Sequence, residues 1–155
     1  MLGPPIDAWY VWIGVSMVSL AVLGVAVAVT PEPPSRATPA AETIEEVAAS
    51  RAPASATYPI DADRVLVSEY RLVIEGEDRE AVTIDHGRMT PAQRGTDLRR
   101  VALGASPNEL FESTATFAEA IETARDERRR IEPAGDRLIV RKLSCGGTDV
   151  TLVTA

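Results

Sequence analysis

The sequence predicts an α+β protein: a transmembrane helix, a proline-rich stalk, and a small antiparallel sheet with packed helices. Three observations carry this prediction. The chain opens with a long uncharged run, four prolines follow within a short stretch, and later segments switch between strand-like alternation and helical spacing of apolar residues. The predicted organisation is an N-terminal tail at 1–7, a transmembrane helix at 8–29, a linker at 30–40, and an α+β domain at 41–155.

The uncharged run extends from Ala8 to Val29 and contains 22 residues. At a rise of 1.5 Å per residue, a helix of this length spans roughly 33 Å, which matches the hydrocarbon core of a bilayer. Trp9, Tyr10 and Trp12 cluster at its start, where aromatic rings favour the lipid headgroup layer. These three residues are therefore candidates for the membrane interface, and membrane lipid is the first predicted partner.

Two alternative interpretations of this run remain. Ala26, Val27 and Ala28 have the small-x-small form that signal peptidase recognises, so cleavage after Ala28 would release a secreted binding domain. Against cleavage, no basic residue precedes the run, and the run exceeds the usual apolar length of a signal peptide. A buried helix of a water-soluble fold would normally keep a polar face, which this run lacks.

Orientation and lateral packing of the span rest on few residues. Arg36 is the only basic residue close to the span, and the positive-inside rule taken literally would place the domain in the cytoplasm. Small domains on a single N-terminal anchor are mostly exported, so we expect an extracellular domain. Gly24 and Ala28 form a small-xxx-small pair suited to helix packing, although alanine-rich helices also produce such pairs by chance.

The linker, "TPEPPSRATPA", contains four prolines in eleven residues and favours an extended polyproline II stalk. A helix is expected next, capped by Thr38, with Pro39 at its first position and a narrow apolar stripe of Ile44, Val47 and Ala48.

The central part predicts strands after a loop through Pro53 and Pro59. Alternating apolar residues in "VLVSEYRLVI" slip in phase at Ser68 and Glu69, which indicates a bulge or a break between two strands. "EGEDRE" turns the chain into "AVTID", which completes a hairpin. "DHGRMTPAQRG" is expected to be turn and loop.

Three helices and a final hairpin are predicted in the rest of the chain. "TDLRRVALG" fits a short helix ended by Gly104, with a strand as the alternative. Ser106 with Glu109, and Thr116 with Glu119, have the spacing of capping boxes. The last of these helices is expected to run to about Arg130, with its apolar face buried and its charged residues exposed: Phe117, Ala120, Ile121 and Ala124 inside, and Glu119, Glu122, Arg125 and Asp126 outside. "DRLIVRKL" and "DVTLV" flank "SCGGT" as a closing hairpin.

Composition argues against several functional classes. The chain has 23 acidic and 16 basic residues, a net charge of -7, and only one lysine, Lys142. An acidic chain does not suit a phosphate backbone, so we expect no nucleic-acid partner. The acidic, arginine-biased composition fits a salt-adapted proteome or a GC-rich genome. Cys145 and His86 are each the only residue of their type, so no intrachain disulfide and no metal site of the usual histidine and cysteine kinds is expected.

No catalytic, cofactor or metal residue is predicted. Ser68, Ser144, Asp85 and His86 are the residue types of a nucleophilic triad, but the chain has no nucleophile-elbow motif, and "DHG" is typical of a turn. Cys145 beside two glycines is either a reactive thiol or an incidental turn residue. A group of acids, Asp61, Asp63, Glu75, Glu77 and Asp78, offers oxygen ligands for a hard cation or forms a solvated surface.

The segments "IDAWYVWIGV" and "PAGDRLIVRKLSCGGTDVTLV" resemble the two ends of a family of short, uncharacterised single-pass membrane proteins of halophilic archaea. Members of that family tend to be encoded beside type IV pilus-like assembly machinery. The resemblance implies a non-enzymatic accessory or minor-pilin-like role with envelope or pilus-like protein partners, and it supplies no functional residues. Archaeal prepilins carry a basic residue and a glycine before the apolar helix. Here Gly3 follows Leu2, so processing of that kind is not predicted.

Overall fold

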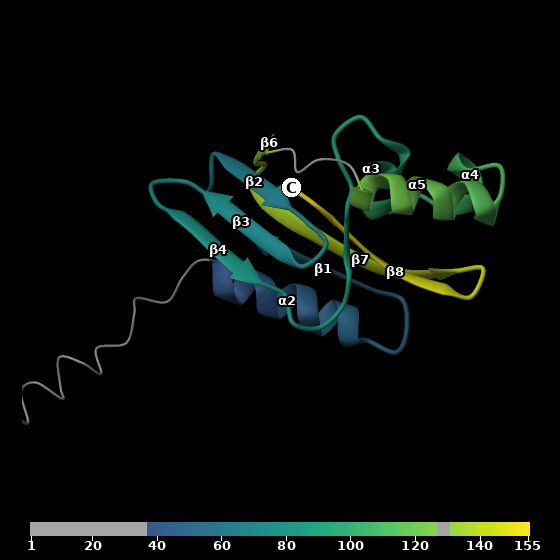
Figure 1. Ribbon diagram of the computed structural model, residues 1–155, viewed down its shortest axis with the longest axis horizontal. Helices are drawn as coiled ribbons and strands as arrows, with labels where there is room; N and C mark the ends of the chain where they lie inside the picture. The colour runs from purple at the N-terminus through teal and green to yellow at the C-terminus, as the bar shows by residue number, and fades with distance from the viewer. Residues whose placement is uncertain (1–36, 127–130) are drawn as a thin grey trace, which may run out of the picture. The chain divides into compact units, whose positions relative to one another are not determined.

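The computed structural model describes residues 37–126 and 131–155 (Figure 1). Within these two ranges, every helix falls short of the length and hydrophobicity needed to cross a bilayer. The predicted membrane features lie outside the described residues: the span at 8–29, the interface residues Trp9, Tyr10 and Trp12, the pair Gly24 and Ala28, and the linker up to Arg36.

The described part is a mixed α+β fold, as the sequence predicts. In chain order its elements are α2 Ala37–Ala49, β1 Ala54–Pro59, β2 Arg64–Val67, β3 Arg71–Glu75, β4 Arg79–Thr83, β5 Met89–Pro91, α3 Asp97–Ala102, α4 Pro107–Leu110, α5 Thr114–Asp126, β6 Glu132–Pro133, β7 Arg137–Cys145 and β8 Thr148–Thr154.

These strands form two sheets where one antiparallel sheet was expected. One sheet has the order β1-β7-β8-β5 and the other the order β4-β3-β2-β6. All pairs are antiparallel except β5 and β8, which are parallel. The parallel pair arises from "RMTPA", where three residues of the expected loop extend along β8 and donate one further bond, from the Ala92 N–H to the Val153 carbonyl at 2.9 Å.

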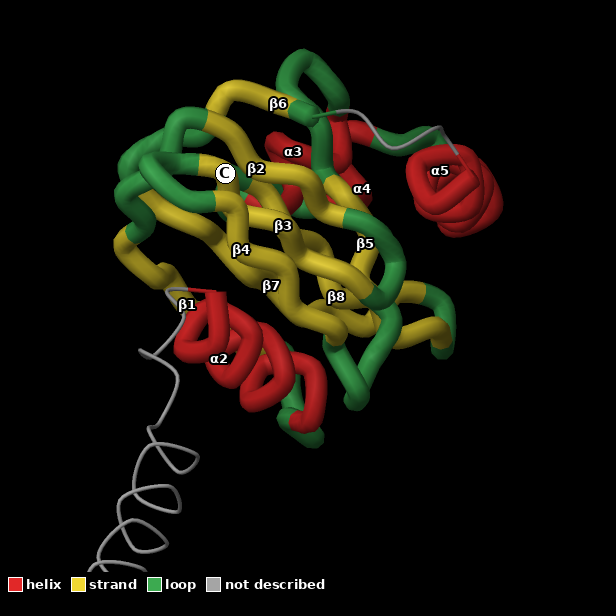
Figure 2. The backbone as a smooth tube through the Cα atoms, turned by 60° about the vertical axis from the view of Figure 1, so that its left-hand side comes forward, coloured by secondary structure: helices red, strands yellow, loops and turns green. Residues whose placement is uncertain are grey.

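Helix α2 packs against strands of both sheets, as Figure 2 shows at the lower edge of the domain. Ile44 and Val47 of the predicted stripe are buried, and so is Ala40, which was not predicted, whereas Ala48 is only partly buried. Residues 37–40, placed in the linker from the sequence, belong to this helix. Alanine is a strong helix former and Pro39 lies within the first described turn, where proline is tolerated, so local propensity here exceeds the polyproline tendency.

The prediction of a loop through Pro53 and Pro59 is wrong, because residues Ala54–Pro59 form strand β1. Its six residues pair with β7, and alternate residues Ala54, Ala56 and Tyr58 pack against the core. Proline was taken as a sign of a loop, but Pro59 lies in an edge strand, where a missing N–H need not break the sheet. Pro91 in β5 and Pro133 in β6 also lie in edge strands.

The predicted hairpins are confirmed. The phase slip at Ser68 and Glu69 is a tight turn between β2 and β3, closed by the Ser68 N–H and the Arg71 carbonyl at 2.8 Å. β3 and β4 form the next hairpin. β7 and β8 form the last one, with Gly146 and Gly147 at φ values of 60° and 81° that favour glycine.

The helix starts are close to prediction, but two caps differ. Ser106 precedes Pro107 at the start of α4 without a side-chain cap bond. In α5 the cap is Ser113 rather than Thr116: Ser113 Oγ accepts from the Thr116 N–H at 3.2 Å, and Thr116 Oγ1 accepts from the Ser113 N–H at 3.1 Å. This reciprocal pair has the geometry of a capping box with threonine in place of glutamate.

The sheet with β7 and β8 at its centre has a hydrophobic cluster on each face. Successive residues of β8 alternate between them: Leu152 packs in the cluster with α3 and α5, and Val153 packs in the cluster with α2. Figure 2 shows α2 and α5 on opposite sides of the domain. This sheet therefore separates two hydrophobic layers, and α5 covers the layer on the face opposite α2.

Candidate functional site

A groove of about 410 Å³ runs beside α5. It lies between α5, α3 and the segment that follows β5. Its lining residues are Pro91, Gln93, Thr96, Asp97, Leu98, Phe111, Thr116, Glu119, Ala120, Thr123 and Ala124. Apolar side chains form part of this lining, and hydroxyl groups, the Gln93 amide and two carboxylates form the rest, so the groove suits a ligand that is partly apolar.

Few buried side chains hold α5 in place. Phe117 and Ile121 are its buried residues. Phe111 meets Phe117 edge to face, with ring centroids 5.1 Å apart and an angle of 61° between the rings. A second hollow of about 220 Å³ lies on the other side of α5, beside the β7–β8 turn. The helix therefore has a space along each flank.

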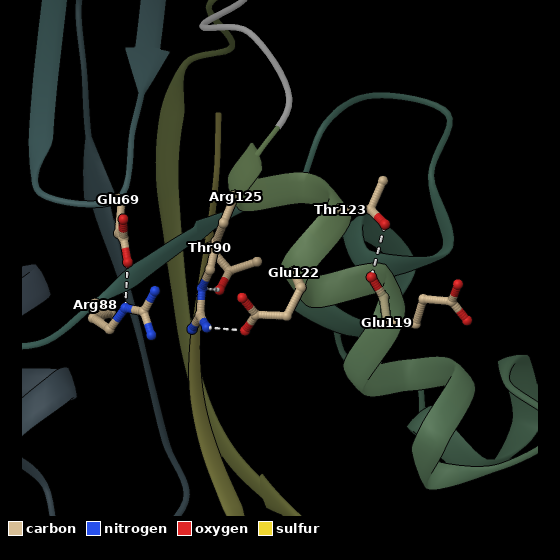
Figure 3. Close-up of polar contacts among 7 residues, drawn as sticks. All are labelled: Glu69, Arg88, Thr90, Glu119, Glu122, Thr123 and Arg125. Atoms are coloured by element: carbon tan, nitrogen blue, oxygen red, sulfur yellow. Dashed lines mark hydrogen bonds and ion pairs between the residues drawn. The ribbon is translucent and has the colours of Figure 1, made fainter.

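Arg125 pins the C-terminal end of α5 to β5. Its Nε donates to Thr90 Oγ1 at 2.9 Å, and one of its terminal nitrogens contacts Glu122 Oε1 at 2.8 Å (Figure 3). The Arg125 side chain is only 9% exposed, so the prediction that it stays in solvent is wrong. The sequence did carry a signal, because Arg125 continues the spacing of four that joins Phe117 to Ile121 on the buried face.

A second ion pair lies near this anchor. Arg88, in the segment before β5, pairs with Glu69 from the turn between β2 and β3, as Figure 3 shows. The hydrogen bond from Arg88 to Glu69 is the largest cause raising the pKa of the Arg88 guanidinium, and the charges of Glu69, Tyr70 and Glu122 act in the same direction. Arg88 thus ties the segment before β5 to the β2–β3 turn, and Arg125 ties α5 to β5.

The groove offers contacts for binding, and its lining residues do not include a histidine, cysteine or lysine. Asp97 pairs with Arg100 at 3.3 Å. Thr123 Oγ1 donates to the backbone carbonyl of Glu119 at 2.8 Å, and this bond does not involve the Glu119 carboxylate. Carboxylates at the rim favour a ligand with a basic group.

The residue types of a triad lie on separate elements. Ser144 is in β7 opposite Asp149 of β8, and Ser68 lies in the β2–β3 turn with its Oγ buried and without a hydrogen-bond partner in the described residues. The backbone N–H groups of Asp85 and His86 donate to Glu45 Oε1 of α2 at 2.8 and 3.4 Å. Within residues 37–126 and 131–155, no hydrogen bond joins the side chains of Ser68, Ser144 and His86.

Cys145 ends β7 and is partly exposed, and it lines the smaller hollow beside α5. Its neighbours there include Gly146, Thr114 and Thr148. The thiol therefore lies beside a hollow of the domain, whose lining residues include the carboxylate of Glu122 but not a histidine, lysine or arginine that would lower the thiol's pKa.

The structure brings part of the acidic group together. The Asp63 N–H donates to the Glu75 carbonyl at 2.8 Å, so the loop before β2 runs beside the β3–β4 turn. Glu75 also pairs with Arg79 at 3.2 Å. Among the described residues, no three acidic, histidine or cysteine side chains are grouped closely enough to hold a metal ion.

Comparison with known proteins gives a family for nearly the whole chain. The model of a family described as a family of unknown function, DUF7283, matches residues 3–143. No curated protein and no solved structure matches the chain.

Proposed function

The chain belongs to the DUF7283 family, and we propose that it is a single-pass membrane protein without enzymatic activity. Its domain serves as an accessory or minor-pilin-like component of an envelope assembly, either pilus-like or secretory. The observation that carries this proposal is the run from Ala8 to Val29, in which 22 successive residues lack a charge. A single charged residue at the centre of a membrane helix opposes insertion by about 2.5–3.5 kcal/mol, and this run contains none.

The stalk and the domain support an interaction role. The prolines between the run and α2 favour an extended spacer, so we expect the domain to be held away from the bilayer. The groove beside α5 combines apolar residues such as Leu98 and Phe111 with the carboxylates of Asp97 and Glu119. A groove of this composition suits a side chain or a peptide segment of a partner protein. The resemblance of the two chain ends to proteins encoded beside pilus-like machinery favours an envelope partner.

Membrane extraction tests the anchor directly. The full chain should stay in the membrane fraction after a carbonate wash. Val18→Arg with Val22→Arg puts two charges at the centre of the run and should move the protein into the soluble fraction. Thr30→Arg with Ser35→Arg adds the same charge outside the run and should leave the protein in the membrane. Soluble wild-type protein would contradict the proposal.

The orientation of the domain is tested with an impermeant thiol reagent. Cys145 is the only cysteine in the chain and is partly exposed in the domain. Labelling on intact cells is the expected result and places the domain outside. Labelling only after lysis would place it in the cytoplasm.

A role in an assembly predicts a phenotype in the native cell. Deletion of the gene should reduce surface filaments or exported proteins, and the wild-type chain should restore them. The variant Val18→Arg with Val22→Arg should not. Unchanged filaments and unchanged export after deletion would contradict the accessory role while leaving the anchor intact.

The second candidate is a secreted binding domain released after Ala28. The small residues Ala26 and Ala28 favour it. N-terminal sequencing of the mature chain separates the two candidates, because cleavage gives a polypeptide that begins at Val29. Ala26→Leu should block that cleavage and retain the chain in the membrane.

A further inference from the structure

The four edge strands of the two sheets differ in length and charge. β5 has three residues and β6 has two, and each contains a proline. β4 has five residues and begins with Arg79 and Glu80. β1 has six residues, "ASATYP", and none of them is charged. Short strands, prolines and charges protect sheet edges from pairing with another chain, and β1 has only its terminal Pro59 as protection.

The direction of the β1 backbone groups follows from its register with β7. The Ile60 N–H donates to the Asp136 carbonyl at 3.1 Å, and these residues stand opposite each other when the β1–β7 register is extended by one residue. Hydrogen-bonded pairs alternate along an antiparallel ladder, so Ala54, Ala56 and Tyr58 direct their backbone groups toward β7. Ser55 and Thr57 therefore direct their N–H and carbonyl groups away from the sheet.

These outward groups are available for pairing. Ser55 and Thr57 are exposed. Within the described residues, their backbone groups make no further backbone hydrogen bond. Helix α2 contacts β1 through the face on which Ala54, Ala56 and Tyr58 pack into the core, and these three residues are only partly buried.

We propose that β1 is a self-association edge, which pairs antiparallel with β1 of a second copy of this chain about a two-fold axis at Ala56. In this register Ser55 of one copy stands opposite Thr57 of the other, twice. Each of the four outward N–H groups then meets a carbonyl of the partner copy. The two sheets join into one continuous sheet with β1 strands at its centre.

The register follows from parity and from proline. Residues of equal parity must face each other, so that outward groups meet outward groups and each face of the joined sheet keeps its own side chains. Pairing centred on Ala56 sets Ser55 against Thr57, the two residues with both an N–H and a carbonyl directed outward. Pro59, which lacks an N–H, then falls outside the hydrogen-bonded core.

Charges near the ends of β1 favour a second copy as the partner. Arg51 lies before the strand, and Asp61 and Asp63 follow it. Antiparallel pairing brings the basic end of one strand toward the acidic end of the other, at both ends of the pair. Between these ends the strand itself is uncharged, so no like charges oppose each other in the hydrogen-bonded part.

Disulfide trapping of the full chain in membranes or detergent tests the pairing. In a Cys145→Ser background, Ala56→Cys places two thiols across the axis, where Cα atoms of a non-hydrogen-bonded pair lie about 4.5 Å apart, within disulfide range. Mild oxidation should give a covalent dimer. Thr83→Cys, in the charged edge strand β4, is the matched control and should stay monomeric. Equal cross-linking of the two variants would overturn the proposal.

Charge exchange gives a second test without cysteines. Ser55→Lys with Thr57→Lys places like charges directly opposite in the proposed pair, and Ser55→Glu with Thr57→Glu does the same with the other sign. Each variant alone should lose most of its dimer in sedimentation at a salt concentration near 0.1 M, and an equimolar mixture should recover it. Because Ser55 and Thr57 are exposed, the thermal midpoint of each variant should stay near the wild-type value.

Besides equal cross-linking of the two cysteine variants, three outcomes would contradict the pairing. They are a wild-type chain that is monomeric at every concentration, charge variants that dimerise as well as the wild type, and Ala56→Cys that forms a disulfide only with a different protein. None of these results affects membrane extraction, so failure of the edge proposal is distinguishable from failure of the proposed anchor.

Discussion

Two neighbouring residues of β7 each cap a different helix. Lys142 directs its Nζ to the carbonyls of Ala48 and Ser50 at 2.8 and 2.5 Å, at the C-terminal end of α2. Arg141, on the other face of the strand, donates to the carbonyls of Val101 and Ala105 near the end of α3. Cations at helix C-termini donate hydrogen bonds to the free carbonyls and interact favourably with the negative end of the helix dipole. This alternation ties a helix to each face of one strand.

Lys142→Met should therefore destabilise the domain by about 1–3 kcal/mol, because it removes charged hydrogen bonds and leaves two carbonyls without a donor. Urea unfolding of the variant measures the loss. Asp149→Asn is the control, because Asp149 is mostly exposed and lies 3.8 Å from Lys142. That control should change stability by less than ~0.5 kcal/mol, as expected for a surface pair. Equal losses would show that the ion pair rather than the cap is responsible.

Gly87 combines a restricted backbone with a close contact. Its φ is 93°, and a Cβ at this position would lie 2.7 Å from the Cβ of Ala48 in α2. Gly95 has a similar φ of 83° but open space around it. Gly95→Ala should cost about 1–2 kcal/mol from backbone strain alone. Gly87→Ala should cost more in the same unfolding experiment, and equal costs would contradict tight packing of this loop on α2.

At the scale of elements, α5 has only two buried residues, Phe117 and Ile121, so its polar contact to β5 should matter for its stability. Arg125→Met removes the donor to Thr90 Oγ1, and Thr90 is fully buried. A buried hydroxyl without a partner costs about 1–3 kcal/mol. We expect faster hydrogen exchange throughout α5, with little change in β7 and β8. Glu122→Gln keeps the bond to Thr90 and should leave the exchange of α5 close to wild type.

Helices and hairpins were predicted well because their signals are local. Glycines at positive φ and the apolar spacing of Phe117 and Ile121 depend on neighbouring residues alone. β1 and β5 were missed because their pairing partners, β7 and β8, lie far along the chain. The cap of α5 was placed at Thr116 rather than Ser113, since both residues have cap chemistry and the tertiary position of the helix selects one of them.

At the scale of the whole molecule, β8 belongs to both hydrophobic clusters. Leu152 is completely buried among α3 and α5, and its neighbour Val153 is buried toward α2. Leu152→Ala should therefore lower the stability of the whole domain by about 2–5 kcal/mol in a single transition. Ile121→Ala in α5 should mainly increase local opening. A two-step transition for Leu152→Ala would show that the clusters unfold independently.

The candidate site was less predictable than the fold. The lining of the groove brings together residues between Pro91 and Ala124 from several elements, and only their packing places them on one surface. Conversely, Ser68, Ser144 and His86 are residue types of a nucleophilic triad, yet they lie in separate turns and strands. Pairing of distant strands decides which polar residues become neighbours, and single-sequence patterns do not contain that information.

The β7–β8 turn packs closely against Thr114, the first residue of α5, since a Cβ at Gly146 would lie 3.3 Å from the Cβ of Thr114. The opposite end of the helix is held by the guanidinium of Arg125. Close packing therefore restricts the N-terminal end of α5, whereas a polar contact holds its C-terminal end. If the Arg125–Thr90 bond breaks, we expect the groove to widen first beside Ala124, which lines it next to that contact.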